Sequence, residues 1–408
     1  MLNMTTFEAA LKQHYTSWKV ENLVYKNNPF YAMIDKYEDF KGELMKVPLI
    51  YGNPQGRSAA MATAVANKTS TQLKAFLLTR TANYGTASIS NEVILASEGN
   101  SDAFLRAATV EIDGTLQSVS RDLAIDLYRD GSGTRGQVVS TQVAGSTTIT
   151  LTNADDIVNF EVGQALVWCA AVSGGSASAT PYYVVAIDRD AGTLQVSATV
   201  GGAAVTATVA GFTASVYLFI QGDYGQKMSG LSAWIPTTVA SNDSFFNVNR
   251  SADRVRLAGV YIDVSAMSIE EGLITMGSRL GREGGNPDTV FLNHSDYANL
   301  DKSLGTKVQY VHEKAGSEAQ ISFRALELNT PTGVVKVFAD QNCPSGYAYM
   351  LQLNTWKLAS LGKCPRMFDT DGLKMLRESA SDSVEIRVVS YAQLCCNAPG
   401  WNGVGKLR

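Results

Sequence analysis

The chain has 408 residues, of which 45% are hydrophobic and 18% are charged, and its formal net charge is -4 at pH 7. Such a chain can bury a sizeable core and is long enough for two or three domains. The slightly acidic balance excludes binding to nucleic-acid phosphates through overall charge, so any contact with DNA must be local.

The first residues and the cysteines indicate where the protein works. The opening segment lacks a basic stretch followed by an apolar core, and no run approaches about eighteen apolar residues, so neither a signal peptide nor a membrane span is predicted. The five cysteines are odd in number, have no C-x-x-C spacing and include a vicinal pair, which favours free thiols in a reducing compartment. We therefore expect a protein that is made and used in a cytoplasm. The cysteines are Cys169, Cys343, Cys364, Cys395 and Cys396.

Two segments near the N-terminus are predicted to lack a core of their own. Residues 1–39 combine a short helical pattern at 5–13 with an aromatic, polar run that an Asn-Asn-Pro sequence interrupts, and we interpret them as an arm. Strand-like runs at 43–51 and 72–84 flank a tip rich in Gly, Ala, Ser and Thr, and they predict a long two-stranded ribbon. Because an isolated ribbon is marginally stable in water, both segments are expected to pack on a neighbour.

The longest uninterrupted element is a predicted amphipathic helix from Ser101 to Asp130. Asn100 and Ser101 are expected to cap its start, and Gly131 is expected to adopt a left-handed conformation past its end. One apolar stripe predicts a strut that lies on a sheet completed by a strand at 383–391, with a polar opposite face. The stripe consists of Leu105, Ala108, Ile112, Leu116, Val119, Leu123 and Leu127.

The composition changes after residue 133. From Gly136 to Gly222 the only Lys or Arg is Arg189, and small residues dominate. Short alternating runs separated by turn signals predict a small all-β module at 134–222. Its glycine-rich edges are typical of insertion points, so we interpret it as an insert in another domain. The runs are TTITL, QALVW, YYVVAI, TLQVSA and ASVYLFI.

Residues 265–368 predict an α+β layer. Ser268 and Glu271 form a capping box for a helix through Leu280, and a buried strand, TVFL, follows. A second helix at 293–304 is expected to be capped by Ser295. Further strands are predicted at 321–328, 334–338, 347–353 and 356–361. A last strand, at 383–391, follows outside this range.

No constellation of residues predicts a catalytic, cofactor or metal site. His14, His294 and His312 are scattered, and none has a partner at ligand spacing. His294 is followed by Ser295 and Asp296, but neighbouring residues at a helix start point in different directions and cannot form a relay. We therefore expect no cofactor, no metal and no enzymatic activity.

Weaker candidates have simpler interpretations. The stretches GNPQGRS and GREGG lack the register of phosphate-binding loops, and no helix is expected to follow the first. Asp340 and Asp369 are interpreted as turn residues. Three cysteines have no histidine beside them in sequence and are expected to be unreactive. They are Cys364, Cys395 and Cys396.

The order of these parts resembles that of tailed-bacteriophage major capsid proteins with the Hong Kong 97-like fold. The resemblance covers nearly the whole chain apart from the β module. It is carried by NPFYAMI with VPLIYGNPQGRSA, by ISNEVILAS before the long helix, by DLYRDGSG after it, and by VFLNHSDYANLDKSLG. It implies an α+β fold with an N-terminal arm, an extended β-hairpin loop, a long spine helix and an axial domain, to which this chain adds a small all-β inserted domain.

On this plan the chain divides into seven segments. They are an N-terminal arm (1–39), an extended loop (40–87), a peripheral domain with the spine helix (88–133), the inserted all-β domain (134–222), the peripheral domain continued (223–264), an axial domain (265–368), and a return to the peripheral domain with a C-terminal tail (369–408).

The resemblance implies a structural subunit that self-assembles into pentamers and hexamers of an icosahedral phage head enclosing double-stranded DNA. Its partners would be other copies of itself, with scaffolding, portal and decoration proteins as further candidates, and packaged DNA would meet the inner face without sequence specificity. The protein would be located in the virion after assembly in the host bacterial cytoplasm, with no membrane partner.

Two properties of some relatives are not expected here. Many relatives begin with a long helical scaffolding segment that is removed, whereas here the arm begins near residue 1, so a separate scaffolding protein or none is expected. Some relatives crosslink a Lys to an Asn covalently. Lys68 is the nearest candidate, but no partner or catalytic Glu accompanies it.

Two other functions stay open. An encapsulin-like cellular compartment would need a cargo-docking surface that the sequence does not reveal. A surface adhesin or carbohydrate-binding protein would act through the β module, with aromatic residues lining a sugar site, although packing in the strand core is favoured for them. These aromatic residues are Trp168, Tyr182, Tyr183 and Tyr217.

Overall fold

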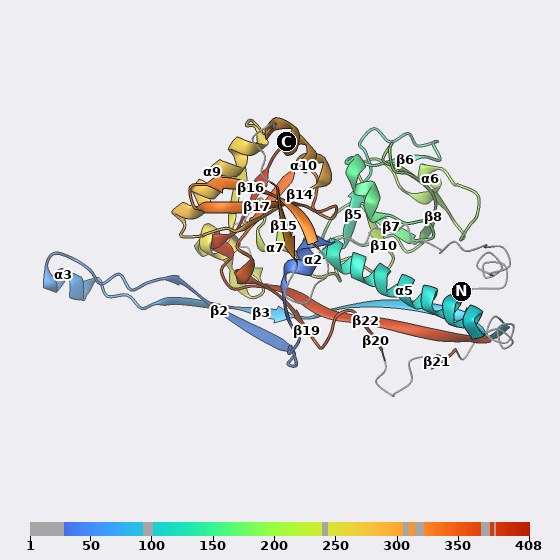
Figure 1. Ribbon diagram of the computed structural model, residues 1–408, viewed down its shortest axis with the longest axis horizontal. Helices are drawn as coiled ribbons and strands as arrows, with labels where there is room; N and C mark the ends of the chain where they lie inside the picture. The colour runs from blue at the N-terminus through green and yellow to red at the C-terminus, as the bar shows by residue number, and fades with distance from the viewer. Residues whose placement is uncertain are drawn as a thin grey trace.

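The computed structural model describes residues 28–92, 101–238, 244–304, 310–314, 322–368, 376–378 and 381–408. Two lobes lie side by side above a long, narrow sheet, and a thin ribbon projects from one end of this arrangement (Figure 1). The predicted helix at 5–13 and the cap at Asn100 lie outside the described residues.

A long six-stranded sheet forms the base of the molecule. Its central strand, β22, pairs antiparallel with β4 from Ser383↔Ser90 to Ala392↔Thr81, and then with β19. The strands of this long sheet are β1 (Asp35–Tyr37), β4 (Thr81–Ser90), β19 (Trp356–Ser360), β20 (Arg366–Met367), β21 (Leu376–Arg377) and β22 (Ser383–Cys396).

The helix α5 (Ser101–Asp126) lies along this long sheet and contacts β4 and β22 (Figure 1). At Gly85 of β4, an added Cβ would lie 2.5 Å from Cγ2 of Val119, so the helix approaches the strand closely. The predicted packing of the apolar stripe on this sheet is confirmed at Val119, and Leu123 and Leu127 share a core with Leu394 of β22.

Two details of α5 differ from the prediction. The helix ends at Asp126 instead of Asp130, because the carbonyls of Leu127 and Arg129 accept bonds from the N–H groups of Leu231 and Gly230 at 2.7 and 2.9 Å. The predicted left-handed Gly131 is confirmed, with a φ of 87°. The face opposite the sheet is not solvated at the C-terminal end, where the residues from Leu123 to Tyr128 are all buried.

A mixed seven-stranded sheet with two helices forms one lobe. The predicted capping box of α9 is confirmed, and the predicted strand TVFL is β14, which is buried at all four positions. The second helix is capped by Asn293, whose Oδ1 accepts from the N–H of Ser295 at 3.1 Å; the expected cap at Ser295 is therefore wrong. The helices are α9 (Ile269–Arg282) and α10 (His294–Leu304). The strand order is β13 (Val260–Asp263), β23 (Gly403–Lys406), β18 (Tyr347–Leu351), β14 (Thr289–Leu292), β17 (Gly333–Ala339), β16 (Ser322–Thr330) and β15 (Tyr310–Lys314).

The sheets do not follow the expected segment boundaries. β19 and β20 fall within residues 265–368 but pair with β22 in the long sheet. β13 and β23 fall outside that range and complete the seven-stranded sheet. These pairings join residues far apart in sequence, and local patterns carry no information about them.

The predicted β module is a six-stranded sheet with its own core. All five predicted runs contain observed strands, and the order is β5 (Thr134–Gln137), β10 (Tyr217–Ile220), β7 (Ala165–Cys169), β8 (Tyr182–Asp188), β9 (Thr193–Ser197) and β6 (Ile149–Thr150). Phe160, Phe212 and Leu218 are fully buried in its core, and the short elements η2 (Ala154–Asn159) and α6 (Ala207–Ala210) cover it. The chain enters and leaves at one place, since an added Cβ on Gly133 would lie 2.5 Å from the carbonyl oxygen of Asp223.

The predicted ribbon consists of β2 (Leu44–Gly52) and β3 (Gln72–Thr79), paired antiparallel. The strand expected to span 72–84 breaks at Arg80, and its second part belongs to β4. The tip contains a short helix, α3 (Met61–Ala66), so the expectation that no helix follows GNPQGRS is wrong. This helix has no buried residue.

A central core joins these layers. It includes Trp234 and Trp356, both fully buried, with ring centroids 6.2 Å apart. Short elements surround it: α2 (Pro29–Met33), α7 (Leu231–Trp234), β11 (Ser244–Phe245), β12 (Val248–Asn249), η3 (Arg250–Ala252), α8 (Arg254–Ala258), η5 (Leu353–Thr355) and η6 (Pro399–Trp401).

Candidate assembly surfaces

The candidate catalytic residues do not form a site in the described part of the chain. Asp296 accepts a bond from the N–H of Gly346 at 2.7 Å and pairs with Arg408 at 3.3 Å. Ser295 is bonded to Asn293 and also accepts from Arg408 at 3.3 Å, so Arg408 contacts both Ser295 and Asp296. Burial lowers the pKa of His294. His14 lies outside the described residues, as does the side chain of His312.

The cysteines and glycine-rich stretches also lack reactive geometry. All five cysteines are free thiols. Burial raises the pKa of Cys364, and it raises that of Cys395 to about 11, which disfavours the nucleophilic thiolate. GREGG forms the C-terminal end of α9, where exposed carbonyls repel phosphate. No group of three or more His, Cys, Asp or Glu among the described residues could bind a metal ion.

Asp340 is more than the turn residue that the sequence predicted. It does accept from the N–H of Asn342 at 2.9 Å, as in a turn. It also accepts from the Tyr128 hydroxyl at 2.9 Å and from the N–H of Phe30 at 3.3 Å. Burial raises the pKa of Asp340 to about 6, although these hydrogen bonds oppose the shift. One carboxyl group therefore links α2 of the arm, the end of α5 and β17. Asp369 lies outside the described residues.

The arm is anchored at the same junction. The ring of Phe30 is fully buried, 5.4 Å from that of Tyr128 and 5.1 Å from that of Phe291. The described end of the arm thus belongs to the central core, whereas the sequence indicated no compact pattern there.

The aromatic residues proposed for a sugar site are mostly structural. An added Cβ on Gly211 would lie 2.3 Å from Nε1 of Trp168, so the indole packs on that backbone. The ring of Tyr182 lies 5.9 Å from that of Phe212, and its hydroxyl donates to the carbonyl of Val209 at 2.8 Å. Both side chains therefore serve the module core, as the packing interpretation predicted.

The ribbon has a buried root. Phe76 and Leu78 of β3 are fully buried, and the Phe76 ring lies 5.0 Å from that of Trp234. The N–H of Leu77 donates to the carbonyl of Phe246 at 3.0 Å. The root is therefore part of the central core.

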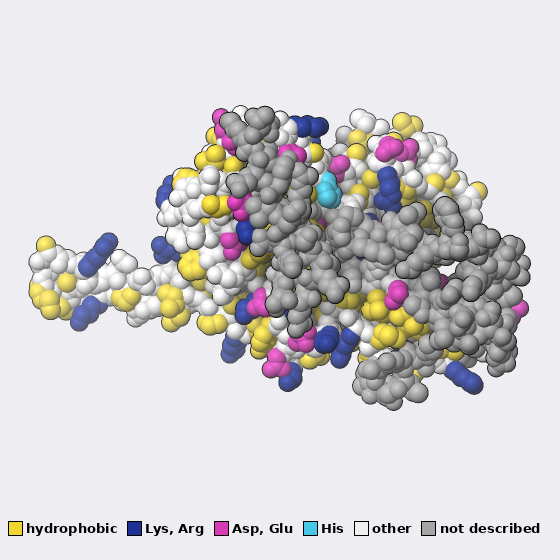
Figure 2. All heavy atoms as spheres, in the orientation of Figure 1, with side chains coloured by type: hydrophobic (Ala, Val, Ile, Leu, Met, Phe, Trp, Pro, Cys, Tyr) yellow, Lys and Arg dark blue, Asp and Glu magenta, His cyan; other side chains and the backbone are white. Residues whose placement is uncertain are grey.

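Beyond its root, the ribbon projects from the body of the molecule and exposes apolar side chains (Figures 1 and 2). Ile50 and Leu73 face each other across the two strands and are each 58% exposed, and Met61 in the tip helix is 80% exposed. The ribbon also carries a one-sided charge, because residues 44–79 contain four basic residues and no acidic one. These basic residues are Lys46, Arg57, Lys68 and Lys74, and all are exposed.

The β module is attached to α5 through buried charges, which we call the charge cluster. Arg135 of β5 pairs with Asp122 and, at 3.3 Å, with Asp126. Lys227 lies 2.5 Å from Asp122, 3.7 Å from Asp126 and 3.1 Å from Asp223. The sequence analysis missed this cluster, although Asp122 and Asp126, one helical turn apart, were a readable signal.

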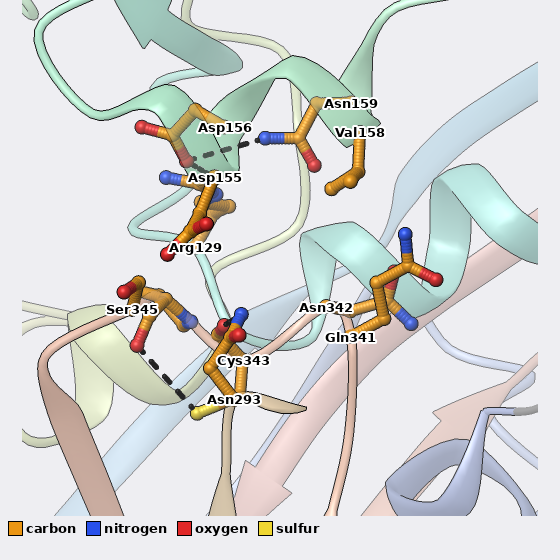
Figure 3. A pocket seen from close by; sticks show the side chains of 11 residues that line it. Arg129, Asp155, Asp156, Val158, Asn159, Asn293, Gln341, Asn342, Cys343 and Ser345 are labelled. Atoms are coloured by element: carbon orange, nitrogen blue, oxygen red, sulfur yellow. Dashed lines mark hydrogen bonds and ion pairs between the residues drawn. The ribbon is translucent and has the colours of Figure 1, made fainter. Parts of the chain in front are cut away.

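A second contact joins the module to the seven-stranded lobe. Ser295 of α10 in that lobe donates to Asp155 of η2 at 3.5 Å. Beside it, Arg129 at the end of α5 pairs with Asp156 of η2 at 2.8 Å. Figure 3 shows these η2 side chains facing Asn293 and Ser345 across a small cavity. Its volume is about 10 Å³, which is room for about one water molecule.

Among the described residues, no helix combines the length and the apolar character needed to cross a membrane. The exposed apolar side chains of the ribbon are a surface that a partner could use. A projecting ribbon with exposed apolar side chains suits a subunit of an assembly, because its outer part would gain stability on a neighbouring molecule.

Comparison with known proteins gives the same result. A family model described as the SU10 major capsid protein matches residues 219–397. The capsid protein of cyanophage A-1(L) has a TM-score of 0.54 at 12% identity, with 98% of each chain covered. Two other similar structures are the SrpI encapsulin of Synechococcus elongatus PCC 7942 (TM-score 0.49, 7% identity, 98% of this chain and 94% of that chain) and the capsid of Myoviridae phage XM1 (TM-score 0.46, 8% identity, 97% and 98%). No curated protein sequence matches this chain.

The fold is therefore the Hong Kong 97-like capsid fold, of mixed α+β class. Over residues 219–397 the chain is similar to a family of phage major capsid proteins, and its fold is that of a phage capsid protein.

Proposed function

We propose that this chain forms the pentamers and hexamers of the phage head and that the ribbon makes the main contact between neighbouring copies. The observation that carries the proposal is the contrast along β3. Phe76 is fully buried at the root, whereas Leu73, three residues away, is 58% exposed. A strand that is anchored in the core and apolar beyond it fits a contact with a second copy.

The charges of the ribbon support the same role. Its four exposed basic residues have no acidic residue beside them between 44 and 79, in a chain whose net charge is -4. Opposite charges steer the docking of two copies and fix their register. We expect the ribbon to meet an acidic surface on the neighbouring subunit.

The parts of the chain then take the following roles. The ribbon would be the extended loop, α5 with the long sheet the peripheral domain, and the seven-stranded sheet the axial domain, now including β13 and β23 but not β19 or β20. The module at 134–222 would be an inserted domain on the outside of the wall, where decoration proteins could bind. Packaged DNA would meet the inner face without sequence specificity.

Electron microscopy of the protein expressed alone and with its neighbouring genes tests this proposal. Uniform closed shells are expected, and nuclease-protected DNA in particles from infected cells would distinguish a phage head from a cellular compartment. A deletion of the ribbon tip, residues 53–71, should leave a folded subunit that forms no shells. Shells of normal size from that variant would contradict the assigned role of the ribbon.

A further inference from the structure

The charge cluster has an unequal number of acids and bases. Each of the three carboxylates lies within 3.7 Å of both cations, and the side chains of Asp126, Arg135 and Lys227 are at most 6% exposed. If every group were ionised, the cluster would carry one unpaired negative charge in a buried position. Such a charge costs several kcal/mol, and proteins avoid the cost by binding a proton.

The cluster also lies where three structural units meet. Asp122 and Asp126 belong to α5, while Arg135 and Asp223 lie where the chain enters and leaves the module. Asn83 of β4 donates to Asp122 at 2.6 Å and accepts from Lys227 at 3.3 Å. A change in the charge of the cluster therefore acts on the helix, the long sheet and the module together.

Solvent reaches one side of the cluster. A cavity of about 610 Å³ lies between β4, α5 and the module, and Asp122, Asp223 and Lys227 line it. Protons can therefore exchange with bulk water, while Asp126 lies behind these residues and is only 4% exposed in its side chain.

We propose that the charge cluster is a proton-controlled joint that fixes the β module against α5 when it binds one proton and loosens the module when that proton is lost. With one proton the cluster is neutral, and every ion pair can form without an excess charge. Without it, one buried carboxylate repels its neighbours, and separation of the module would restore its hydration. This inference concerns a single subunit and does not depend on assembly.

The pKa values of the three acids support this order of events. Burial and the neighbouring Asp122 raise the pKa of Asp126 to about 7, against the attraction of Arg135 and Lys227. Burial also raises the pKa of Asp223. For Asp122 burial acts in the same direction, but Arg135 and Lys227 outweigh it, so its pKa is lowered. The extra proton therefore belongs on Asp126, and the joint loosens as the pH rises through about 7.

Amide hydrogen exchange of the full-length unassembled subunit tests the joint. The exchange rates of wild type and Asp126→Asn are measured in the segments 131–137 and 219–230 at pH 6 and at pH 8.5. The two proteins are compared at the same pH, so the intrinsic exchange rates cancel. The variant has two carboxylates for two cations and nothing to titrate. We expect equal protection at pH 6 and about tenfold faster exchange in wild type at pH 8.5.

Two further variants complete the experiment. Asp223→Asn removes a different acid of the cluster and should also abolish the pH effect, which keeps the test valid if Asp126→Asn does not fold. Asp156→Asn removes an acid of the neighbouring contact with Arg129 and should preserve the pH effect of wild type. The proposal would be overturned if the ratio of the wild-type exchange rate to that of each cluster variant were the same at pH 6 and at pH 8.5.

Discussion

Substitutions on β3 can separate folding of the subunit from assembly of the shell. Phe76→Ala removes a fully buried ring that lies 5.0 Å from that of Trp234, and the cavity should lower the free energy of unfolding by about 3–5 kcal/mol. Leu73→Asp changes a side chain that is 58% exposed. It should lower that free energy by less than about 1 kcal/mol, the range of strand propensities.

The effect on assembly should have the reverse order. Burying an unpaired carboxylate in a contact between copies costs about 3–5 kcal/mol, so Leu73→Asp should abolish shells at concentrations where wild type assembles. Urea unfolding followed by tryptophan fluorescence measures stability, and light scattering with electron microscopy measures assembly. Normal shells from Leu73→Asp, or a loss of subunit stability as large as that of Phe76→Ala, would refute the assignment of the ribbon.

Three other predictions concern the layers behind the ribbon. Gly85→Ala places a Cβ 2.5 Å from Val119 and should destabilise the subunit by about 1–3 kcal/mol, as measured by thermal unfolding. Gly114→Ala in α5 is the control. Its added Cβ would have no atom within 4 Å, and the substitution should stabilise the subunit by up to about 1 kcal/mol. The pKa of Asp340 rises from 3.8 to about 6 on folding, so between these values the folded state binds a proton that the unfolded state has lost. The free energy of unfolding should therefore fall as the pH rises from about 4 to 6. Asp340→Asn should remove this slope, and urea unfolding at several pH values measures it. Deletion of residues 134–222 with a short linker should leave a folded core at pH 8, because the carboxylates that faced Arg135 then regain contact with water. Circular dichroism checks this, and a complete loss of folding would show that the module is not a separable domain.

Local patterns predicted the elements well because each pattern has a local physical cause. The Ser268–Glu271 capping box marked the start of α9, and the alternating runs of the module marked its strands. The stripe on α5 predicted its contact with the long sheet. In each case the information lies within one or two turns or within a few alternating residues.

Features that depend on distant residues could not be predicted in this way. β23 joins β13 and β18 in the seven-stranded sheet, whereas β22 is the central strand of the long sheet, although only a short turn separates the two strands in sequence. Asp340 resembled any turn residue until Phe30 and Tyr128 were brought to it by the fold. The same holds for the charge cluster, whose members come from three segments.

The buried charges explain how one module can be an independent unit and still have a fixed orientation. Its own core and its adjacent chain ends would allow it to fold alone. A buried ion pair adds little net stability, because the cost of removing both charges from water offsets their attraction, but a misplaced partner leaves an uncompensated charge and is strongly disfavoured. The contacts through Arg135 and Arg129 therefore add little to the free energy that attaches the module to α5. Their main effect is to select one orientation of the module on that helix. In a shell built from many identical copies, that selection places every module at the same angle to the wall.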